Sequence, residues 1–183
     1  MSDVSAQVRA FFALWPDERS LAAVRRIAQL VAHERGGRAL RDENLHVTVA
    51  FLGDVAGARL AELKDVGEEI ASASRAFELT LDRVGGAAHG IAWLAPNAVP
   101  AELHELRDAL VERLDAAGFP TERRTFRPHV TLARNCPRLV RRIERPPVIW
   151  PVKRLSLVAS TLAPGGSRYD ELAAWPLGGR SAR

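Results

Sequence analysis

Two short segments of the sequence share a motif that could carry out acid–base chemistry. Residues 44–53 read NLHVTVAFLG and residues 125–134 read TFRPHVTLAR, so His-Val-Thr occurs twice in a similar hydrophobic frame. Because successive side chains of a β-strand point to opposite faces, each histidine shares a face with the threonine two residues later. If the two strands lie side by side, four polar side chains meet in one site. The residues of this predicted site are His46, Thr48, His129 and Thr131.

Two imidazoles and two hydroxyls suit an anion with several oxygens, since all of these groups can donate hydrogen bonds. An unperturbed imidazole titrates near pH 6.5, so one histidine can accept a proton while the other gives one. The hydroxyls would hold phosphoryl oxygens as negative charge builds up on them. Such a site can break a phosphodiester without a metal ion.

Packing or metal binding could also account for the motif. A histidine on a strand often has only a packing role, and threonine is a common strand residue. A zinc site would need further ligands, and the sequence has neither His-x-His nor His-Glu-x-x-His. The duplication, with the same offset and flanking pattern, favours the paired acid–base site. We expect the other histidines to be structural or exposed: His33 at a helix end, His89 in a turn and His104 on a helix.

Length and composition bound the class of protein. A chain of 183 residues forms one domain or two small lobes with a shared core. Apolar residues make up 47% and charged residues 26%, as in folded soluble proteins. No apolar run is long enough to cross a bilayer, and the first residues lack a basic region and a cleavage site. We therefore expect no signal peptide and a cytoplasmic location, and the single Cys136 excludes an internal disulfide.

The hydrophobic pattern predicts a series of strands and helices around the two motifs. Hairpin patterns outnumber parallel crossovers, which favours an α+β fold, and one His-Thr strand in each half indicates a pseudo-twofold duplication. The Arg- and Pro-rich stretch 135–150 is predicted to be a mobile loop. The predicted helices are three: one between Asp17 and Gly36, one that includes Leu60 to Ile70, and one that includes Leu103 to Leu114. The predicted strands are 8–15, 45–53, 77–86, 90–96, 129–134, 152–162 and 168–177.

The two motifs and the segments around them resemble those of a known protein family. HVTV (46–49) and HVTL (129–132) are similar to the two HxTx motifs of the 2H phosphoesterase superfamily. RAFFALWP near the start, NLHVTVAFLGDV, FRPHVTLAR and KRLSLVASTLAPGGSRYDELAAWPL near the end resemble the bacterial and archaeal RNA 2′,3′-cyclic phosphodiesterases, long called 2′-5′ RNA ligases. The resemblance spans nearly the whole chain, with the segments in the expected order.

The resemblance implies a single bilobal domain over residues 1–183, with antiparallel-rich sheets, flanking helices and an active site in a central cleft. It implies metal-independent and cofactor-independent hydrolysis of an RNA 2′,3′-cyclic phosphate end to a 2′-phosphomonoester. His46 would be the proton donor to the leaving 3′-oxygen and His129 the proton acceptor that activates water, although the symmetry makes these roles reversible. Thr48, Thr131 and Arg134 would bind the substrate phosphate.

Further residues near the motifs bear on this expectation. Strict strand alternation turns Arg134 away from His129, so a bend after Ala133 is required to bring it to the site. Alternation also allows only one of Phe11 and Phe12 to face the cleft, where its ring could stack on a nucleobase.

From Arg123 to Arg154 there are ten basic residues and one acid, a local net charge of +9. This charge suits an RNA backbone, although a solvated basic face would look the same. The arginines expected to contact RNA are Arg123, Arg124, Arg138, Arg141 and Arg142.

Two alternative functions stay open. The same chemistry could act on a small cyclic nucleotide or an ADP-ribose cyclic phosphate rather than on RNA. The chain could instead bind RNA ends or ligate them by a 2′-5′ linkage, with hydrolysis only incidental. We see no heptad pattern or long apolar stripe and expect a monomer without a membrane partner.

Overall fold

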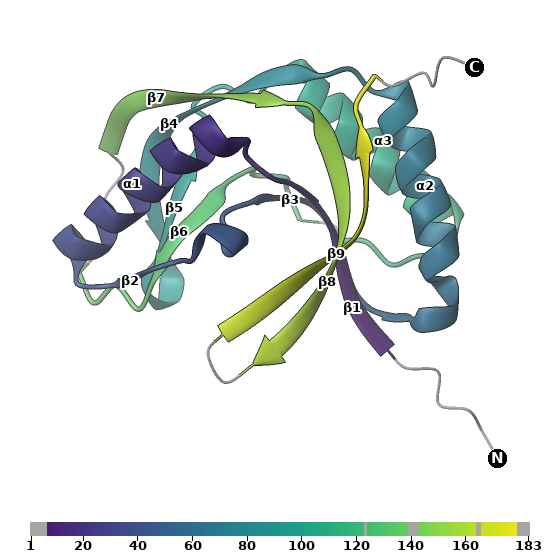
Figure 1. The fold of residues 1–183 in the computed structure, drawn as a ribbon, viewed down its shortest axis with the longest axis horizontal. Coiled ribbons are helices and arrows are strands. Elements are labelled where there is room, and N and C mark those ends of the chain that lie inside the picture. Colours follow the sequence, from purple (N-terminus) through teal and green to yellow (C-terminus); the bar gives the residue numbers. More distant parts are fainter. Residues whose placement is uncertain (1–6, 123, 139–142, 164–165, 179–183) are drawn as a thin grey trace.

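Three helices and nine strands make up the described part of the computed structural model, which covers residues 7–122, 124–138, 143–163 and 166–178. Figure 1 shows their arrangement. The strands are β1 (Gln7–Leu14), β2 (Arg38–Ala39), β3 (Val47–Ala56), β4 (Phe77–Ala87), β5 (Ile91–Ala95), β6 (Val130–Arg134), β7 (Ile143–Val152), β8 (Arg154–Ala163) and β9 (Gly166–Pro176). The helices are α1 (Glu18–Arg35), α2 (Leu60–Ala73) and α3 (Ala101–Ala116), so the α+β prediction is confirmed.

The strands form one antiparallel sheet in the order β7-β4-β5-β6-β3-β1-β8-β9, with the short β2 on β6. Its two four-stranded halves meet between β3 and β6, which are joined through one residue pair, Val47 with Val130. Each half contributes one His-Val-Thr strand to this seam. The duplicated arrangement expected from the sequence therefore appears as two similar halves with the two motifs at their junction.

The helices link the two halves. Helix α1 follows β1 but packs on β2, β6 and β7 of the opposite half, while α2 packs on α3, β8 and β9 (Figure 1). The predicted start and end of α1 are confirmed, since the Asp17 carboxylate accepts a hydrogen bond from the Ser20 amide at 2.8 Å and Gly36 ends the helix with φ of 73°. The Ser20 hydroxyl donates to the carbonyl of Ile149 in β7, which ties α1 to that strand.

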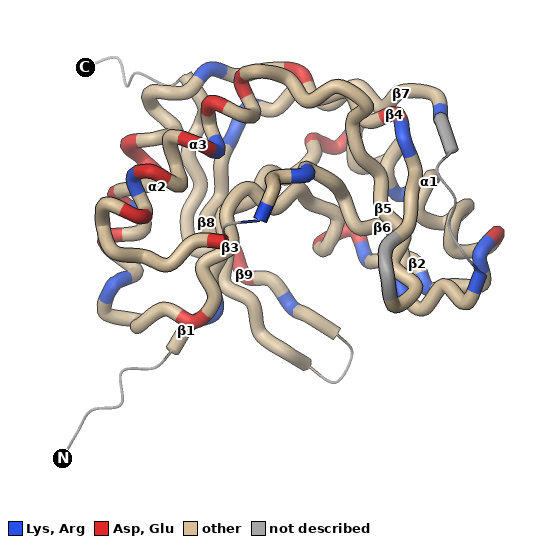
Figure 2. The backbone as a smooth tube through the Cα atoms, turned by 180° about the vertical axis from the view of Figure 1, so that it is seen from behind, with Lys and Arg blue, Asp and Glu red and all other residues tan. Residues whose placement is uncertain are grey.

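Charge is distributed unevenly over the molecule. Figure 2 shows Asp and Glu residues gathered on α2 and α3, whereas β2 begins with Arg38. None of the helices within the described ranges is both long and apolar enough to cross a membrane.

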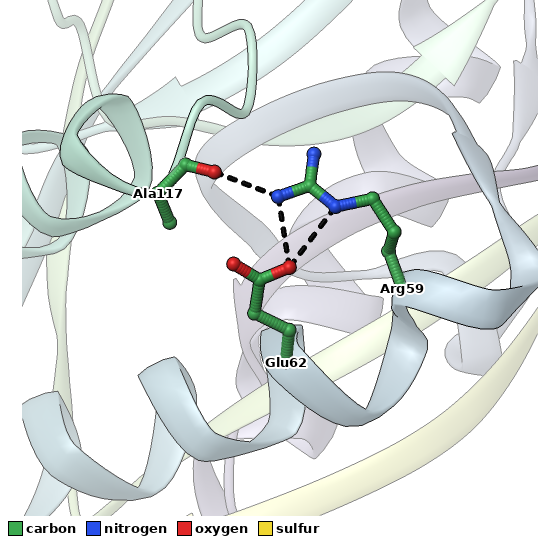
Figure 3. A network of polar contacts seen from close by, with 3 residues as sticks. All are labelled: Arg59, Glu62 and Ala117. Atoms are coloured by element: carbon green, nitrogen blue, oxygen red, sulfur yellow. Dashed lines mark hydrogen bonds and ion pairs between the residues drawn. The ribbon is translucent and has the colours of Figure 1, made fainter.

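A polar network holds the end of α3 against the start of α2 (Figure 3). The Arg59 guanidinium donates to the Glu62 carboxylate at 2.8 and 3.0 Å and to the carbonyl of Ala117 at 2.7 Å. It also lies over the ring of Phe119, 3.7 Å from its centroid. These contacts fix the beginning of the segment that runs from α3 to His129.

The prediction of a mobile loop over 135–150 is wrong for residues 143–150. These residues belong to β7, which pairs with β4 at 143–144 and 148–152 and is irregular between them, and residues 139–142 lie outside the described part. Val148, Trp150 and Val152 are buried in alternation, as a half-buried strand requires. The prolines that suggested a loop are tolerated because β7 is an edge strand, where a missing backbone N–H costs little.

The other predicted strands and helices are confirmed within a few residues. The hairpin expected from 77–86 and 90–96 is β4 with β5, and the last two predicted strands are β8 with β9. Part of the Pro-Gly-Gly turn between them, residues 164–165, lies outside the described residues. The two-residue strand β2 has too short a pattern to be predicted. His33 lies in the last turn of α1, His89 in a turn with φ of 62°, and His104 on α3.

Candidate active site

The seam between β3 and β6 brings the two motifs together. Val47 and Val130 pair directly, and extending that antiparallel register by one residue places Thr48 opposite His129 and His46 opposite Thr131. Directly opposed side chains of an antiparallel pair lie on the same face of the sheet. Val47 and Val130 are fully buried on the other face. The structure therefore brings all four sequence-predicted motif residues to one face.

Both histidines are held by the backbone in the same way. His46 Nδ1 lies 3.0 Å from the carbonyl oxygen of Asn44, and His129 Nδ1 lies 2.8 Å from the carbonyl oxygen of Arg127. A carbonyl only accepts, so each Nδ1 donates its hydrogen and each neutral ring keeps its lone pair on Nε2. The same carbonyl, two residues before each histidine, thus sets the same tautomer in both halves.

The reactive nitrogen of His46 also contacts a hydroxyl of the predicted site. Its Nε2 lies 3.2 Å from the Thr48 Oγ1, which donates to the lone pair when the imidazole is neutral. Thr131 lies across from His46 on β6 and pairs with Trp93 of β5. The Nε2 of His46 thus lies beside a hydroxyl that could also hydrogen-bond to the oxygens of a phosphoryl group bound on this face.

The surroundings of the two histidines differ. His46 is enclosed by the rings of Trp15, Phe11 and Tyr169, whose centroids lie 4.8, 5.1 and 5.1 Å from its own. Burial among them lowers the pKa of His46 from 6.5 to about 4; the hydrogen bond to Asn44 opposes this change, and nearby His129 adds to it. His46 is therefore neutral at pH 7 in the free protein. The side chain of His129, in contrast, is exposed.

The two adjacent phenylalanines divide as strand alternation predicts. Phe11 faces His46 and packs with Ala13 and Val158 in a small separate cluster, whereas Phe12 is fully buried in the main core. Only Phe11 is thus placed beside the predicted site.

The irregular end of β6 decides the place of Arg134. In the pairing of β5 with β6, Ala92 faces Ala133 but Trp93 faces Thr131, so Leu132 is an extra residue in β6. Such a bulge shifts the alternation of the side chains that follow it. Arg134 is exposed and lines a cavity of about 430 Å³ together with Asn44 and Tyr169, both of which contact His46. The required bend is present, one residue earlier than expected.

A second cavity lies on the other side of the histidine pair. It has a volume of about 240 Å³, and His129 and Thr48 form part of its wall. Phe51 and Phe126 add aromatic surface, and Arg107 and Arg127 add positive charge. The predicted site is thus flanked by one cavity on the His46 side and one on the His129 side.

The predicted RNA-binding arginines are only partly brought to the site. Arg124 lines the smaller cavity and pairs with Glu122 at 3.1 Å. Arg138 donates to the Glu34 carbonyl at the end of α1 and lines neither of the two cavities. The remaining three, Arg123, Arg141 and Arg142, lie outside the described residues.

Sequence reasoning missed three residues that shape the site, Trp15, Asn44 and Tyr169, and the ring centroid of Trp15 lies 4.8 Å from that of His46. Asn44 supplies the carbonyl that orients His46, and its side-chain amide donates to the carbonyl of Ser167 in β9 at 3.2 Å. Tyr169 packs edge-on against His46. As the only tyrosine of the chain Tyr169 could have been noticed, but its distance in sequence from His46 gave no reason to connect them. Within the described ranges, no three His, Cys, Asp or Glu side chains are grouped so that they could hold a metal ion.

Comparisons with known proteins identify a family of similar sequences. The model of the 2′-5′ RNA ligase superfamily matches residues 15–162. The RNA 2′,3′-cyclic phosphodiesterase of Escherichia coli (strain K12) is 33% identical over 144 residues, covering 77% of this chain and 80% of that protein. The RNA 2′,3′-cyclic phosphodiesterase of Thermus thermophilus is 29% identical over 191 residues, covering 96% and 93%.

A solved structure extends the similarity to the fold. The crystal structure of E. coli LigT complexed with 3′-AMP superimposes with a TM-score of 0.80 at 29% sequence identity, covering 94% of this chain and 99% of that one. The range matched by the superfamily model includes both His-Val-Thr motifs and both strands of the seam. The chain belongs to the 2′-5′ RNA ligase superfamily.

Proposed function

We propose that this protein is an RNA 2′,3′-cyclic phosphodiesterase that uses the two histidines as an acid–base pair and needs no metal ion. The observation that supports the proposal is the matched pair of imidazoles at the seam, each with Nδ1 hydrogen-bonded to the backbone carbonyl two residues earlier, which leaves Nε2 as the nitrogen that can exchange a proton with a substrate. Superfamily relatives that bear the name RNA 2′,3′-cyclic phosphodiesterase support RNA as the substrate.

The proposed reaction is the in-line attack of water on the cyclic phosphorus. The water oxygen forms a bond to phosphorus while the bond from phosphorus to the 3′-oxygen breaks. One imidazole takes the proton of the water, and the other gives a proton to the 3′-oxygen. The product is a 2′-phosphomonoester with a free 3′-hydroxyl. After release of the product, transfer of a proton between the histidines through solvent restores the starting state.

We assign the donor role to His46 and the acceptor role to His129. His129 is exposed and meets the water that serves as nucleophile. His46 is enclosed by aromatic rings, and the negative charge of a bound phosphate favours its protonated form. Because burial lowers the pKa of His46, the imidazolium formed there is a strong acid toward the leaving oxygen. Thr48, Thr131 and Arg134 bind the phosphoryl oxygens in this scheme.

The reaction is tested with a short RNA that carries a 2′,3′-cyclic phosphate, incubated with the protein in EDTA. Phosphorus NMR of the product should show a single 2′-phosphate, with the same rate in the absence of EDTA. A 3′-phosphate would contradict the proposed leaving group, loss of activity in EDTA would contradict the absence of a metal, and a lack of any product would contradict the proposed function.

The assignment of the two roles is tested with the variants His46→Ala and His129→Ala. Each should lower kcat on the cyclic RNA by about a thousandfold, within the usual range for general acid–base groups. On a phosphodiester whose leaving group is p-nitrophenolate, which needs no proton, His46→Ala should recover most of its activity and His129→Ala should not. The reverse pattern would exchange the roles. His33→Ala, an exposed histidine on α1, is the matched control and should keep full activity on both substrates.

A further inference from the structure

The larger cavity, on the His46 side, has a strongly positive wall. Three of its residues are arginines, Arg38 from β2, Arg41 from the segment after it and Arg134 from the end of β6, and its lining contains no carboxylate among the described residues. The β8–β9 hairpin closes the cavity on the other side with Leu162 and Tyr169. A cavity of about 430 Å³ with three cations in its wall is suited to an anionic group of a ligand.

The described residues provide no close ion pair that neutralises any of these three arginines. Within the described ranges, no ion pair or side-chain hydrogen bond uses Arg38 or Arg134, and Arg41 makes only a 3.6 Å contact with Glu43 between side chains that are 73% and 61% exposed. Such a surface pair is weak and easily exchanged for another anion. Several, but not all, of the other arginines are by contrast paired with a carboxylate at 3.2 Å or less, including Arg25, Arg59, Arg113, Arg145, Arg154 and Arg168.

The cavity adjoins the reacting histidine directly. Tyr169 and Asn44, which line it, are the residues that pack against His46 and accept its Nδ1–H. A nucleotide bound with its cyclic phosphate between the histidines has one further anionic group nearby, the phosphodiester on its 5′ side. A mononucleotide 2′,3′-cyclic phosphate with a free 5′-hydroxyl lacks this group.

We infer that the cavity is a subsite for the phosphodiester on the 5′ side of the cyclic end, with Arg38 and Arg41 as its binding residues. This inference rests on the proposed function and narrows the substrate to an oligoribonucleotide rather than a small cyclic nucleotide. Arg134 lies in the same lining and connects the subsite to the reacting phosphate. Arg38 and Arg41 contribute to affinity for the longer substrate and take no part in the proton transfers.

The test compares a trinucleotide and a mononucleotide, both with a 2′,3′-cyclic phosphate and a 5′-hydroxyl. Arg38→Gln and Arg41→Gln should each lower kcat/KM on the trinucleotide about tenfold, mainly through KM, and leave the mononucleotide unchanged. Arg75→Gln, which removes an exposed charge next to α2, is the matched control and should change neither value. Equal losses on both substrates, or no loss on the trinucleotide, would overturn the inference.

A binding measurement keeps this test independent of turnover. Affinity of each protein for a trinucleotide with a 2′-phosphate end is measured at several salt concentrations. For each subsite variant the slope of log affinity against log salt should become shallower by about 0.7, the value for one lost contact to single-stranded phosphate. An unchanged slope with Arg38→Gln and Arg41→Gln would overturn the subsite. If the wild-type protein does not hydrolyse the cyclic RNA but the variants still have the shallower slope, the proposed hydrolysis is overturned and the subsite remains.

Discussion

His46 and His129 have equivalent backbone partners, but His46 is half-buried and His129 is exposed. In each case the carbonyl two residues earlier fixes the tautomer, so the chemistry available at Nε2 is the same on both sides of the seam. The aromatic rings around His46 have no counterpart in the described contacts of His129. A symmetric motif therefore yields two imidazoles with different surroundings, which suits an acid–base pair.

The depressed pKa of His46 predicts a specific dependence of stability on pH. The pKa is 6.5 in the unfolded chain and about 4 in the folded one, so between these values the unfolded state binds the extra proton. The free energy of unfolding should therefore fall as the pH is lowered from 6.5 to 4, by up to about 3 kcal/mol from this group. Above pH 6.5 the group contributes no pH dependence.

Urea unfolding of the wild type and His46→Gln at pH 7, 6, 5 and 4 measures this effect. Glutamine does not titrate, so the loss of stability between pH 6.5 and 4 should be smaller in the variant. His33→Gln removes an exposed imidazole and should follow the wild type. Parallel curves for the wild type and His46→Gln would contradict the burial of His46.

Close packing of α2 on β1 and β9 helps to position the site, and a glycine on the helix permits this packing. Gly67 on α2 faces β1 and β9, and a Cβ at this position would lie 2.4 Å from the ring of Trp175 and 3.0 Å from that of Phe12. Helix α2 can therefore approach the sheet because position 67 has no side chain. The same contact holds β1 in place, which carries Phe11 to His46.

Gly67→Ala should destabilise the protein although alanine favours a helix. The gain in helix propensity is about 1 kcal/mol, whereas forcing a methyl group against two aromatic rings costs about 1–3 kcal/mol. The net loss expected in the free energy of unfolding is about 1 kcal/mol, measured by urea unfolding. Glu68→Ala, the exposed neighbour on the same helix, should change stability by no more than about 0.5 kcal/mol. A Gly67→Ala protein as stable as the wild type would contradict this packing.

Both edge strands of the sheet carry residues that disfavour pairing with a second chain. The outer strand β7 carries Pro146, Pro147 and Pro151, which cannot donate backbone hydrogen bonds to a second chain. The opposite edge, β9, carries charged residues at positions 168, 170 and 171. The large exposed apolar residues in the described ranges lie on three different elements, with Leu30 on α1, Ile149 on β7 and Leu162 on β8.

These features predict a monomer in solution. Scattered apolar residues and blocked edges provide no extended surface for self-association within the described part of the chain. Size-exclusion chromatography with light scattering should give a mass near the chain mass of 20.0 kDa across a wide range of protein concentration. A mass that doubles as the concentration rises would contradict the prediction.

The sequence by itself determined the motif residues, the face that each pair shares, the caps of α1 and most of the strands and helices. These features are local, because they follow from the side-chain period of a strand and from hydrogen bonds between residues a few positions apart. The bulge at Leu132 and the edge strand β7 were harder to foresee. Each depends on the partner strand, which decides whether an extra residue or a proline can be accommodated.

Only the tertiary structure decided how the surroundings of the two motifs differ. The order of strands places Val47 beside Val130, and the β8–β9 hairpin carries Tyr169 to the ring of His46. No local pattern encodes these contacts, because they join residues far apart in the chain through a shared core. Burial by distant residues then lowers the pKa of His46, while His129 stays exposed although it begins the same His-Val-Thr motif. The two motifs have the same chemistry in sequence, and their packing gives them different surroundings.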